Sequence, residues 1–345
     1  MTHLRGAICR RLLRPLAVVA ALFAGSAGAA SLDCVAAAQP HEKLICAEDA
    51  LSRLNDRLAR TFDGALQALS PEGKSLLRAG QQSWLALVRQ ACPTEASSKA
   101  APDDLPAACL AREYSSRLTQ LDHAVLTVGP FRFMAVERFG AIPAQGSPQR
   151  YATSEIAYPR IDNDDGADIG RWNDWIAQEI KGLDRSYANT DVAVGFTIHH
   201  AAHDLISTEI SSFYYGHGAA HGMGDFRFLN YLLARAAPLQ TTDLFAADKP
   251  WVNFLAHRAA DDLTARAARN EIALFDDMKA EALAASVGNP ARWRIDSDGL
   301  TIQFALYEIA PHSEGMLKVT LPWADLAPYL IEDRPFRFTP RIAQP

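Results

Sequence analysis

The sequence lacks the motifs of the common hydrolases. Its 345 residues include no H-E-x-x-H run, which a zinc protease would need, and no G-x-S-x-G nucleophile elbow. They also include no low-complexity tract and no internal repeat. The composition, 49% hydrophobic and 21% charged, is that of a globular protein, and the length favours two domains. We therefore expect a folded protein that is not an enzyme.

Apolar runs long enough to span a membrane are missing as well. The stretch Leu16 to Phe23 is shorter than the roughly 20 residues that a bilayer requires. Four arginines and no acidic residue precede it, and the small residues Ala27-Gly28-Ala29 follow it. This pattern predicts a cleaved signal peptide over residues 1–29, rather than an uncleaved anchor, and a periplasmic or secreted protein without a membrane span. Asp33 before Cys34 fits a lipoprotein attachment site poorly.

An excess of basic residues is also absent. The formal net charge is −6, and it becomes −10 when the four arginines of the predicted signal peptide are removed. Proteins that bind nucleic acid carry a basic footprint, so this charge argues against a nucleic-acid partner. It is compatible with a cationic protein partner, which an acidic surface would attract.

Cysteine is scarce and unevenly placed. Cys9 belongs to the predicted signal peptide, and the other four cysteines lie in the first third of the mature chain. An even set confined to one region of an exported protein indicates disulfides, for which three connectivities exist. The sequence-local choice joins Cys34 to Cys46 and Cys92 to Cys109. Their eleven and sixteen intervening residues differ from the close pairs of a zinc site, which is the rival interpretation.

Around these cysteines the apolar residues follow helical spacing. They recur every three or four residues from Lys43 to Leu69, which predicts one helix. Ser70-Pro71 then starts a second helix, as N-cap and first helical residue, that runs to Cys92. A third helical stripe covers Leu110 to Leu121. Residues 30–123 are thus predicted to form a small helical domain stapled by two disulfides.

Two runs of this domain carry a family resemblance. G-Q-Q-S-W-L-A-L-V-R-Q-A-C, from Gly80 to Cys92, and C-L-A-R-E-Y-S-S-R-L-T-Q-L, from Cys109 to Leu121, resemble LprI-type lysozyme inhibitors. The resemblance covers residues 31–123 and implies a domain that binds lysozyme. Its signature residues are Gln81, Trp84, Arg89, Cys92 and Cys109, with Arg89 five rather than about four residues after Trp84. From the helix pattern alone, Trp84 is predicted to lie in the core, and Arg89 to pack its stem or cap a carbonyl.

After His123 the spacing changes from helical to alternating. Strands are predicted over the segments Val125 to Val128, Phe131 to Phe139, Tyr151 to Tyr158, Asp191 to Ile198, Leu205 to Tyr215, Phe226 to Leu233, Trp293 to Ile295, Leu300 to Glu308 and Met316 to Leu321. Helices are predicted over Ile169 to Ile180 and Trp251 to Ala268, with a further run to Ala285, and a loop over Ala141 to Gln149. This order predicts an α+β fold with a mainly antiparallel sheet, divided into a first part, 124–215, and a C-terminal domain, 216–345.

One short segment imitates a calcium site. From Ile161 to Gly166, carboxylates and an asparagine precede a glycine, as they do in a calcium loop. The later glutamate of an EF-hand is missing. We therefore predict a turn and the N-cap of the following helix rather than a cation site.

The densest group of glycines, histidines and aromatic residues lies in Ser211 to Leu233. Such a stretch could hold a metal, a catalytic histidine, or a tight strand connection. His217 and His221 are four residues apart, as are His199 and His203, so a helix at either place would present a metal pair. Glycines around the first pair and strands beside the second disfavour a helix, and we predict no metal and no cofactor.

The same stretch begins a second resemblance. Gly218-Ala219-Ala220-His221-Gly222, Leu239-x-x-x-Asp243-Leu244-Phe245, and D-G-L-T-I-Q-F-A-L-Y-E-I-A-P-H-S-E-G from Asp298 to Gly315 are similar to the C-terminal domain of RsiV-type lysozyme-sensing anti-sigma factors. The resemblance covers residues 125–335, and the same domain pair occurs beside the catalytic domain of some peptidoglycan deacetylases. The signature residues are Gly218, His221, Gly222, Tyr307, Pro311 and Gly315, and His312 stands where tyrosine is common.

Together these features predict an exported envelope protein that binds a protein partner. The resemblances imply a lysozyme-type muramidase, occluded sterically by the loop Ala310 to Gly315 or by the glycine-histidine loop. The side chains expected to contact the partner are His217, His221, His312 and Glu314. The alternative hypothesis is an accessory module of the cell envelope that binds peptidoglycan or another glycan.

Overall fold

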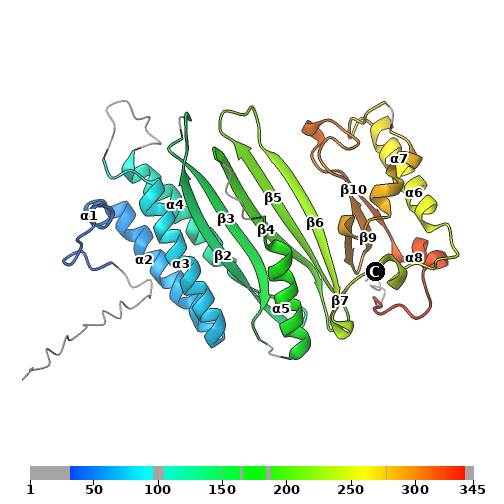
Figure 1. The fold of residues 1–345 in the computed structure, drawn as a ribbon, viewed down its shortest axis with the longest axis horizontal. Coiled ribbons are helices and arrows are strands. Elements are labelled where there is room, and N and C mark those ends of the chain that lie inside the picture. Colours follow the sequence, from blue (N-terminus) through cyan, green and yellow to red (C-terminus); the bar gives the residue numbers. More distant parts are fainter. Residues whose placement is uncertain are drawn as a thin grey trace, which may run out of the picture.

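The computed structural model describes residues 32–95, 105–147, 149–163, 166–183, 188–276 and 278–338. The predicted signal peptide, 1–29, lies outside these residues. Figure 1 shows three parts along the long axis of the molecule: a group of helices, a large central sheet, and a C-terminal part with its own smaller sheet. The predicted α+β class, with helices first and a mainly antiparallel sheet after them, is confirmed.

The helical part consists of α1 (Pro40–Ala47), α2 (Asp49–Gln67), α3 (Pro71–Ala91) and α4 (Pro106–Asp122). The single helix predicted from Lys43 to Leu69 is wrong, because Glu48 adopts an extended conformation (φ −112°, ψ 108°) and separates α1 from α2. One extended residue does not disturb the apolar spacing, so the periodicity could not reveal the break. Ser70 is the N-cap of α3 as predicted, and its Oγ accepts a hydrogen bond from Gly73 N at 3.0 Å.

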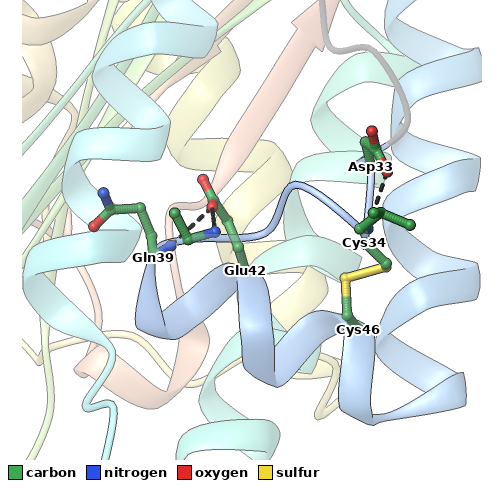
Figure 2. Close-up of a disulfide and its surroundings, with 7 residues drawn as sticks. Asp33, Cys34, Gln39, Glu42 and Cys46 are labelled. Atoms are coloured by element: carbon green, nitrogen blue, oxygen red, sulfur yellow. Dashed lines mark hydrogen bonds between the residues drawn. A yellow bond between two sulfur atoms is a disulfide. The ribbon is translucent and has the colours of Figure 1, made fainter.

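Both predicted disulfides are present. Cys34 bonds to Cys46 (S–S 2.06 Å) and Cys92 bonds to Cys109 (1.97 Å). Figure 2 shows the first bridge beside α1, whose first turn is closed by the Glu42 carboxylate accepting from Gln39 N at 2.9 Å. The second bridge is buried in the core of the helical part and ties the end of α3 to the start of α4.

The central sheet has seven strands in sequential order: β1 (Val125–Val128), β2 (Phe131–Pro143), β3 (Tyr151–Ile161), β4 (Thr190–Ala201), β5 (Ile206–Gly216), β6 (Met223–Leu232) and β7 (Ala237–Pro238). Neighbours are antiparallel except β3 and β4, which are parallel and joined through α5 (Ala167–Ile180). The predicted hairpin of β4 and β5 is confirmed. Pairing of β2 with β3 continues to Pro143, so the predicted loop Ala141 to Gln149 begins too early.

Helices cover the sheet in two places. On one face, α5 buries Ile169, Trp172 and Ile176 against a group of strand residues, Phe133, Ile156, Val194 and Ile210. Near the β1 edge of the sheet, α3 packs on β2, and Met134 and Val136 of β2 belong to the core of the helical part. Asp162 reinforces this contact, because its carboxylate accepts from Ser70 N and Ser70 Oγ, both at 2.7 Å.

The predicted N-cap at the end of Ile161 to Gly166 is confirmed, since α5 begins at Ala167 with Gly166 as its N-cap. Asp162 is only 6% exposed and is held by Ser70 and Arg160, so this carboxylate has a structural role. Residues 164 and 165 of the segment lie outside the described part of the chain.

The C-terminal part contains α6 (Trp251–Ala268), α7 (Ala280–Val287), α8 (Trp323–Leu326), and a sheet of β8 (Trp293–Asp296), β9 (Gly299–Gln303) and β10 (Lys318–Leu321). The helical run predicted to Ala285 is interrupted, because Asn270 takes a left-handed conformation (φ 58°) just after α6. The strand predicted from Leu300 to Glu308 ends early, at Gln303. The expected division at residues 215 and 216 falls at the end of β5, and the central sheet continues past it through β6 and β7.

Candidate recognition surface

Two loops far apart in the sequence meet at one end of the molecule. Residues 217–222 join β5 to β6, and residues 304–317 join β9 to β10; both lie towards the top of Figure 1. The imidazole rings of His221 and His312 stack with their centroids 4.2 Å apart. The hydroxyl of Tyr307 lies 3.4 Å from Nε2 of His221. We call His221, Tyr307 and His312 the loop cluster.

Glycine is required in the first loop for two separate reasons. Gly218 has φ 86°, a conformation that other residues rarely adopt, and it lies within the turn that Ala219 N closes by donating to Gly216 O at 2.9 Å. At Gly222 a Cβ atom would lie 2.1 Å from Cζ of Phe213, because that ring packs directly on the backbone. The glycines of the signature therefore shape the loop that carries His221.

The second loop is held by hydrogen bonds at its base and to neighbouring segments. A hydrogen bond from Phe304 N to Leu317 O (2.9 Å) closes its base. The Glu308 carboxylate accepts from Ala305 N at 2.7 Å and from Arg292 at 3.0 Å, and it also binds Ser286 Oγ. This network supports Tyr307 in a left-handed conformation (φ 62°), which costs on the order of 1 kcal/mol for a residue with a large side chain. The loop is thus preorganised around an exposed tyrosine.

Apolar exposure concentrates near the two loops. Large hydrophobic side chains are exposed at six described positions, and three of these are Tyr307 (47%), Phe213 (48%) and Met223 (43%). Exposed aromatic side chains grouped on rigid elements are typical of protein-binding surfaces. The loop cluster and these neighbours therefore form the strongest candidate surface for recognition.

The structure separates the four residues predicted to contact a partner. His221 is exposed and His312 is half-buried beside it, so these two belong to one surface. Glu314 lies half-buried in the short 3-10 turn that also contains His312. His217 is placed differently from the prediction, because its side chain is only 1% exposed and cannot meet a partner directly.

His217 instead lies between Ser147 and Asp191. Its Nδ1 is 2.9 Å from Ser147 Oγ, and its Nε2 is 3.3 Å from Asp191 Oδ1. The serine hydroxyl donates to Gln149 Oε1 at 2.7 Å, so it accepts from Nδ1 and its proton points away from the imidazole. This geometry is not that of a serine activated by a histidine base. These contacts join the loop after β2, which holds Ser147, and the start of β4, which holds Asp191, to the loop after β5.

The other histidine pair has structural contacts too. His199 lies on β4, and its Nε2 is 2.9 Å from the Glu209 carboxylate. The ring of His203 packs edge-on against Phe131. Within the described residues, no three His, Cys, Asp or Glu side chains are grouped so that they could hold a metal ion.

The signature residues of the helical part lie mainly in its core. Trp84 is 2% exposed and meets Tyr114 edge-on at 5.1 Å, so its predicted core position is confirmed. Burial raises the pKa of Tyr114 to about 12. Gln81 is buried and accepts from Arg117 Nε at 3.0 Å, whereas Arg89 is exposed in the last turn of α3.

Sequence reasoning missed Arg117, which is completely buried and lies at the boundary between α4 and the sheet. Its guanidinium is 2.8 Å from the Glu137 carboxylate of β2 and also donates to Gln120. Burial raises the pKa of Glu137, and the contact with Arg117 opposes that shift. A signal was available, because Arg117 falls on the buried stripe of α4 that contains Leu110, Tyr114 and Leu121.

Comparison with known proteins assigns the two ends of the chain. Residues 34–121 match the family model of the lysozyme inhibitor LprI, and residues 242–324 match that of DUF3298, a family of proteins of unknown function. The chain therefore carries an LprI domain and a DUF3298 domain. The LprI domain contains both disulfides.

Curated relatives support the first of these matches. Lipoprotein LprI from Mycobacterium bovis and from Mycobacterium tuberculosis are each 31% identical over 118 residues, which cover 33% of this chain. The chain spans about half the length of these relatives (54%).

Among solved structures, a DUF3298 family protein from Pseudomonas aeruginosa is similar with a TM-score of 0.44 and 16% identity, covering 59% of this chain and 96% of its own. A DUF3298 family member from Bacteroides fragilis gives 0.42 and 14%, covering 60% and 96%. Both scores lie below 0.5, so neither likeness extends the assignment. In the part of the chain that the structure describes, no helix is long and apolar enough to cross a membrane.

Proposed function

We propose that the protein is an exported, non-enzymatic lysozyme inhibitor, which binds a lysozyme-type muramidase and occludes its cleft. The observation that carries this proposal is the match of residues 34–121 to the lysozyme inhibitor LprI, together with the paired cysteines inside the match. Disulfides are typical of proteins that function outside the cytoplasm, which supports export.

The loop cluster supplies the second part of the proposal. An exposed tyrosine on a preorganised loop, stacked histidines beside it and an adjacent phenylalanine form an exposed aromatic surface that could contact a cleft. The net charge of −10 that remains after loss of the predicted signal peptide would steer a cationic muramidase towards the protein. Inhibition by this route is steric and requires no chemistry.

The direct test is an inhibition assay with a cationic C-type lysozyme and the mature protein at low salt. We expect loss of muramidase activity and a saturable binding isotherm in calorimetry. Full activity together with no heat of binding at micromolar protein would refute the proposal. A Ser147→Ala variant that inhibits as the wild type does would agree with a non-enzymatic mechanism.

A matched pair of variants identifies which part of the protein binds. Tyr307→Ala removes an exposed aromatic side chain from the loop cluster, and Leu105→Ala removes an exposed apolar side chain from the helical part. If the loop cluster enters the cleft, Tyr307→Ala weakens binding about tenfold or more, as truncation at an aromatic hot spot does, and Leu105→Ala has little effect. The reverse pattern would assign recognition to the helical part.

The second candidate is a module that binds peptidoglycan. It is favoured by the same exposed rings, Tyr307 and Phe213, because aromatic side chains can lie against sugar rings. Co-sedimentation with purified sacculi, measured beside the lysozyme assay, distinguishes the two functions. Sedimentation of the protein without any inhibition of lysozyme would support the peptidoglycan-binding module.

A further inference from the structure

A groove crosses the central sheet on the face opposite to α5. Its floor is made of small residues on neighbouring strands: Ala157 of β3, Ala193 and Gly195 of β4, and Ser211 of β5. Gly195 pairs with Ser211 across the antiparallel ladder, so these side chains lie on one face. Because they are small, they leave a hollow of about 380 Å³ above the sheet. That volume is sufficient for one long side chain.

Aromatic residues form the two walls of the groove. Phe139 of β2 stands on the side of the helical part, and Phe213 of β5 stands on the side of the loop cluster. Each ring already has a neighbour on the protein, since the Arg117 guanidinium lies 5.1 Å from the centroid of Phe139, and Phe213 packs on Gly222. The groove is thus continuous with the candidate recognition surface through Phe213.

A carboxylate lies between these walls. Glu155 of β3 pairs with Phe139 on one side and with Ala193 on the other, which places it on the groove face. Its Oε2 accepts from Gln120 Nε2 at 3.0 Å. Among the described residues, its other oxygen has no hydrogen-bond partner.

The cation that acts on Glu155, Arg117, is shared with another carboxylate. Arg117 contacts Glu137 at 2.8 Å, so its charge serves that carboxylate first. Burial raises the pKa of Glu155 and the neighbouring carboxylates of Glu113 and Glu137 raise it further, whereas the hydrogen bond from Gln120 and the charge of Arg117 oppose the rise. Among the described residues that line the groove, Glu137 and Glu155 are carboxylates and none is a lysine or arginine, so a cation bound there would compensate the charge of Glu155.

We propose that this groove receives a lysine or arginine side chain of the protein partner, whose cationic group pairs with Glu155. This inference rests on the proposed function, because it specifies how the partner is held beside the loop cluster. The alkyl part of the side chain fits between Phe139 and Phe213, and the charged head reaches the carboxylate. A neutral sugar would cover Glu155 without compensating its charge, so a cationic side chain fits the groove better.

The first experiment compares Glu155→Gln with Glu281→Gln, which removes the same charge from an exposed position on α7. Binding of C-type lysozyme is measured by calorimetry for both variants and the wild type. We expect Glu155→Gln to raise Kd about tenfold, the effect of losing one charge-assisted hydrogen bond, and Glu281→Gln to leave it almost unchanged. Equal, small effects of the two variants would overturn the proposal while leaving lysozyme binding intact.

The second experiment does not need lysozyme. N-acetyl-arginine amide is titrated into the ¹⁵N-labelled mature protein, and amide shifts are followed at Ala193 and Gly195. Saturable shifts that Glu155→Gln abolishes would support the groove even if lysozyme does not bind, in which case the proposed function alone would fail. No shifts with the arginine amide, or equal shifts with tri-N-acetylglucosamine, would overturn the proposal.

Discussion

The two ends of this chain reach stability by different means. The helical part has two disulfides, and a completely buried arginine links it to Glu137 of the sheet. The C-terminal part contains no cysteine and is organised around Trp293, which packs edge-on against Phe245 and Trp251. Both parts bury an apolar core, and the first adds covalent and polar contacts to it.

The two parts are of similar length, so size does not explain this difference. In the helical part, cross-links that restrict the unfolded chain add to the stability that its apolar core provides. The C-terminal part buries a large apolar cluster between α6, α7 and its three-stranded sheet. Reductant should therefore destabilise the helical part but not the C-terminal part, whereas truncation of Trp293 should destabilise the C-terminal part.

Trp293→Ala should have the largest effect. The side chain is fully buried, and its indole Nε1 donates to Val287 O at 2.8 Å, so truncation leaves both a cavity and an unpaired carbonyl. We expect a loss of about 3–5 kcal/mol in the free energy of unfolding of the C-terminal part. Urea unfolding followed by near-ultraviolet circular dichroism measures it.

The control for this prediction is Phe275→Ala, which shortens an aromatic side chain that is 37% exposed in the same part. It should change the stability by no more than about 0.5 kcal/mol. A similar loss for both variants would mean that the buried tryptophan does not organise this core.

The disulfide Cys92–Cys109 should come next in size. Its sequence separation of 17 residues corresponds to a loss of about 3 kcal/mol when the bridge is removed from the helical part. The double variant Cys92→Ser, Cys109→Ser is compared with Cys34→Ser, Cys46→Ser, whose bridge is more exposed and separates 12 residues. Removing the Cys34–Cys46 bridge should cost less free energy of unfolding, because its serine hydroxyls would lie near the surface, whereas those at positions 92 and 109 would be buried in the core.

Reductant provides an independent check of the same comparison. Dithiothreitol should lower the unfolding midpoint of the helical part and leave the C-terminal transition of the wild type in place. If the C-terminal transition shifted by the same amount, the two parts would unfold as one cooperative unit, and the contrast between them would be lost.

Much of the fold was predictable because local spacing determines it. Helical periodicity gave α3 and α4, and alternation gave the hairpin of β4 and β5. Local spacing could not show the break at Glu48, which leaves the apolar stripe intact. It also could not show where β9 ends, because the alternating residues beyond Gln303 form a loop that hydrogen bonds to Glu308 stabilise.

The recognition surface was predictable only in part. His221 and His312 were both expected to contact the partner, and the structure stacks their rings. His217 was expected beside them, yet its burial depends on Ser147 from another loop and on Asp191 of β4, which no local pattern reveals. Glu155 was missed because its groove depends on the packing of four strands, and the sequence does not give their spatial order.

The smallest predicted effect concerns the polar boundary between the helical part and the sheet. Burial, and then the charges of Glu113 and Glu137, raise the pKa of Glu155 above its ordinary value of 4.5. A carboxyl group whose pKa is raised by folding contributes its full stability below about pH 4.5 and loses it as the pH rises through the folded-state value. Ionised Glu155 is therefore a cost to the protein at neutral pH.

Glu155→Gln should thus stabilise the protein at pH 7 by on the order of 1 kcal/mol, and this gain should disappear as the pH falls towards 4.5. Thermal unfolding of the wild type, Glu155→Gln and the exposed control Glu281→Gln at both pH values measures the difference. The same variant is expected to bind a cationic partner less well, so greater stability and weaker binding should occur together, as they do where a carboxylate is retained for recognition. A variant that is less stable than the wild type at pH 7 would show that Glu155 is a structural residue of the boundary.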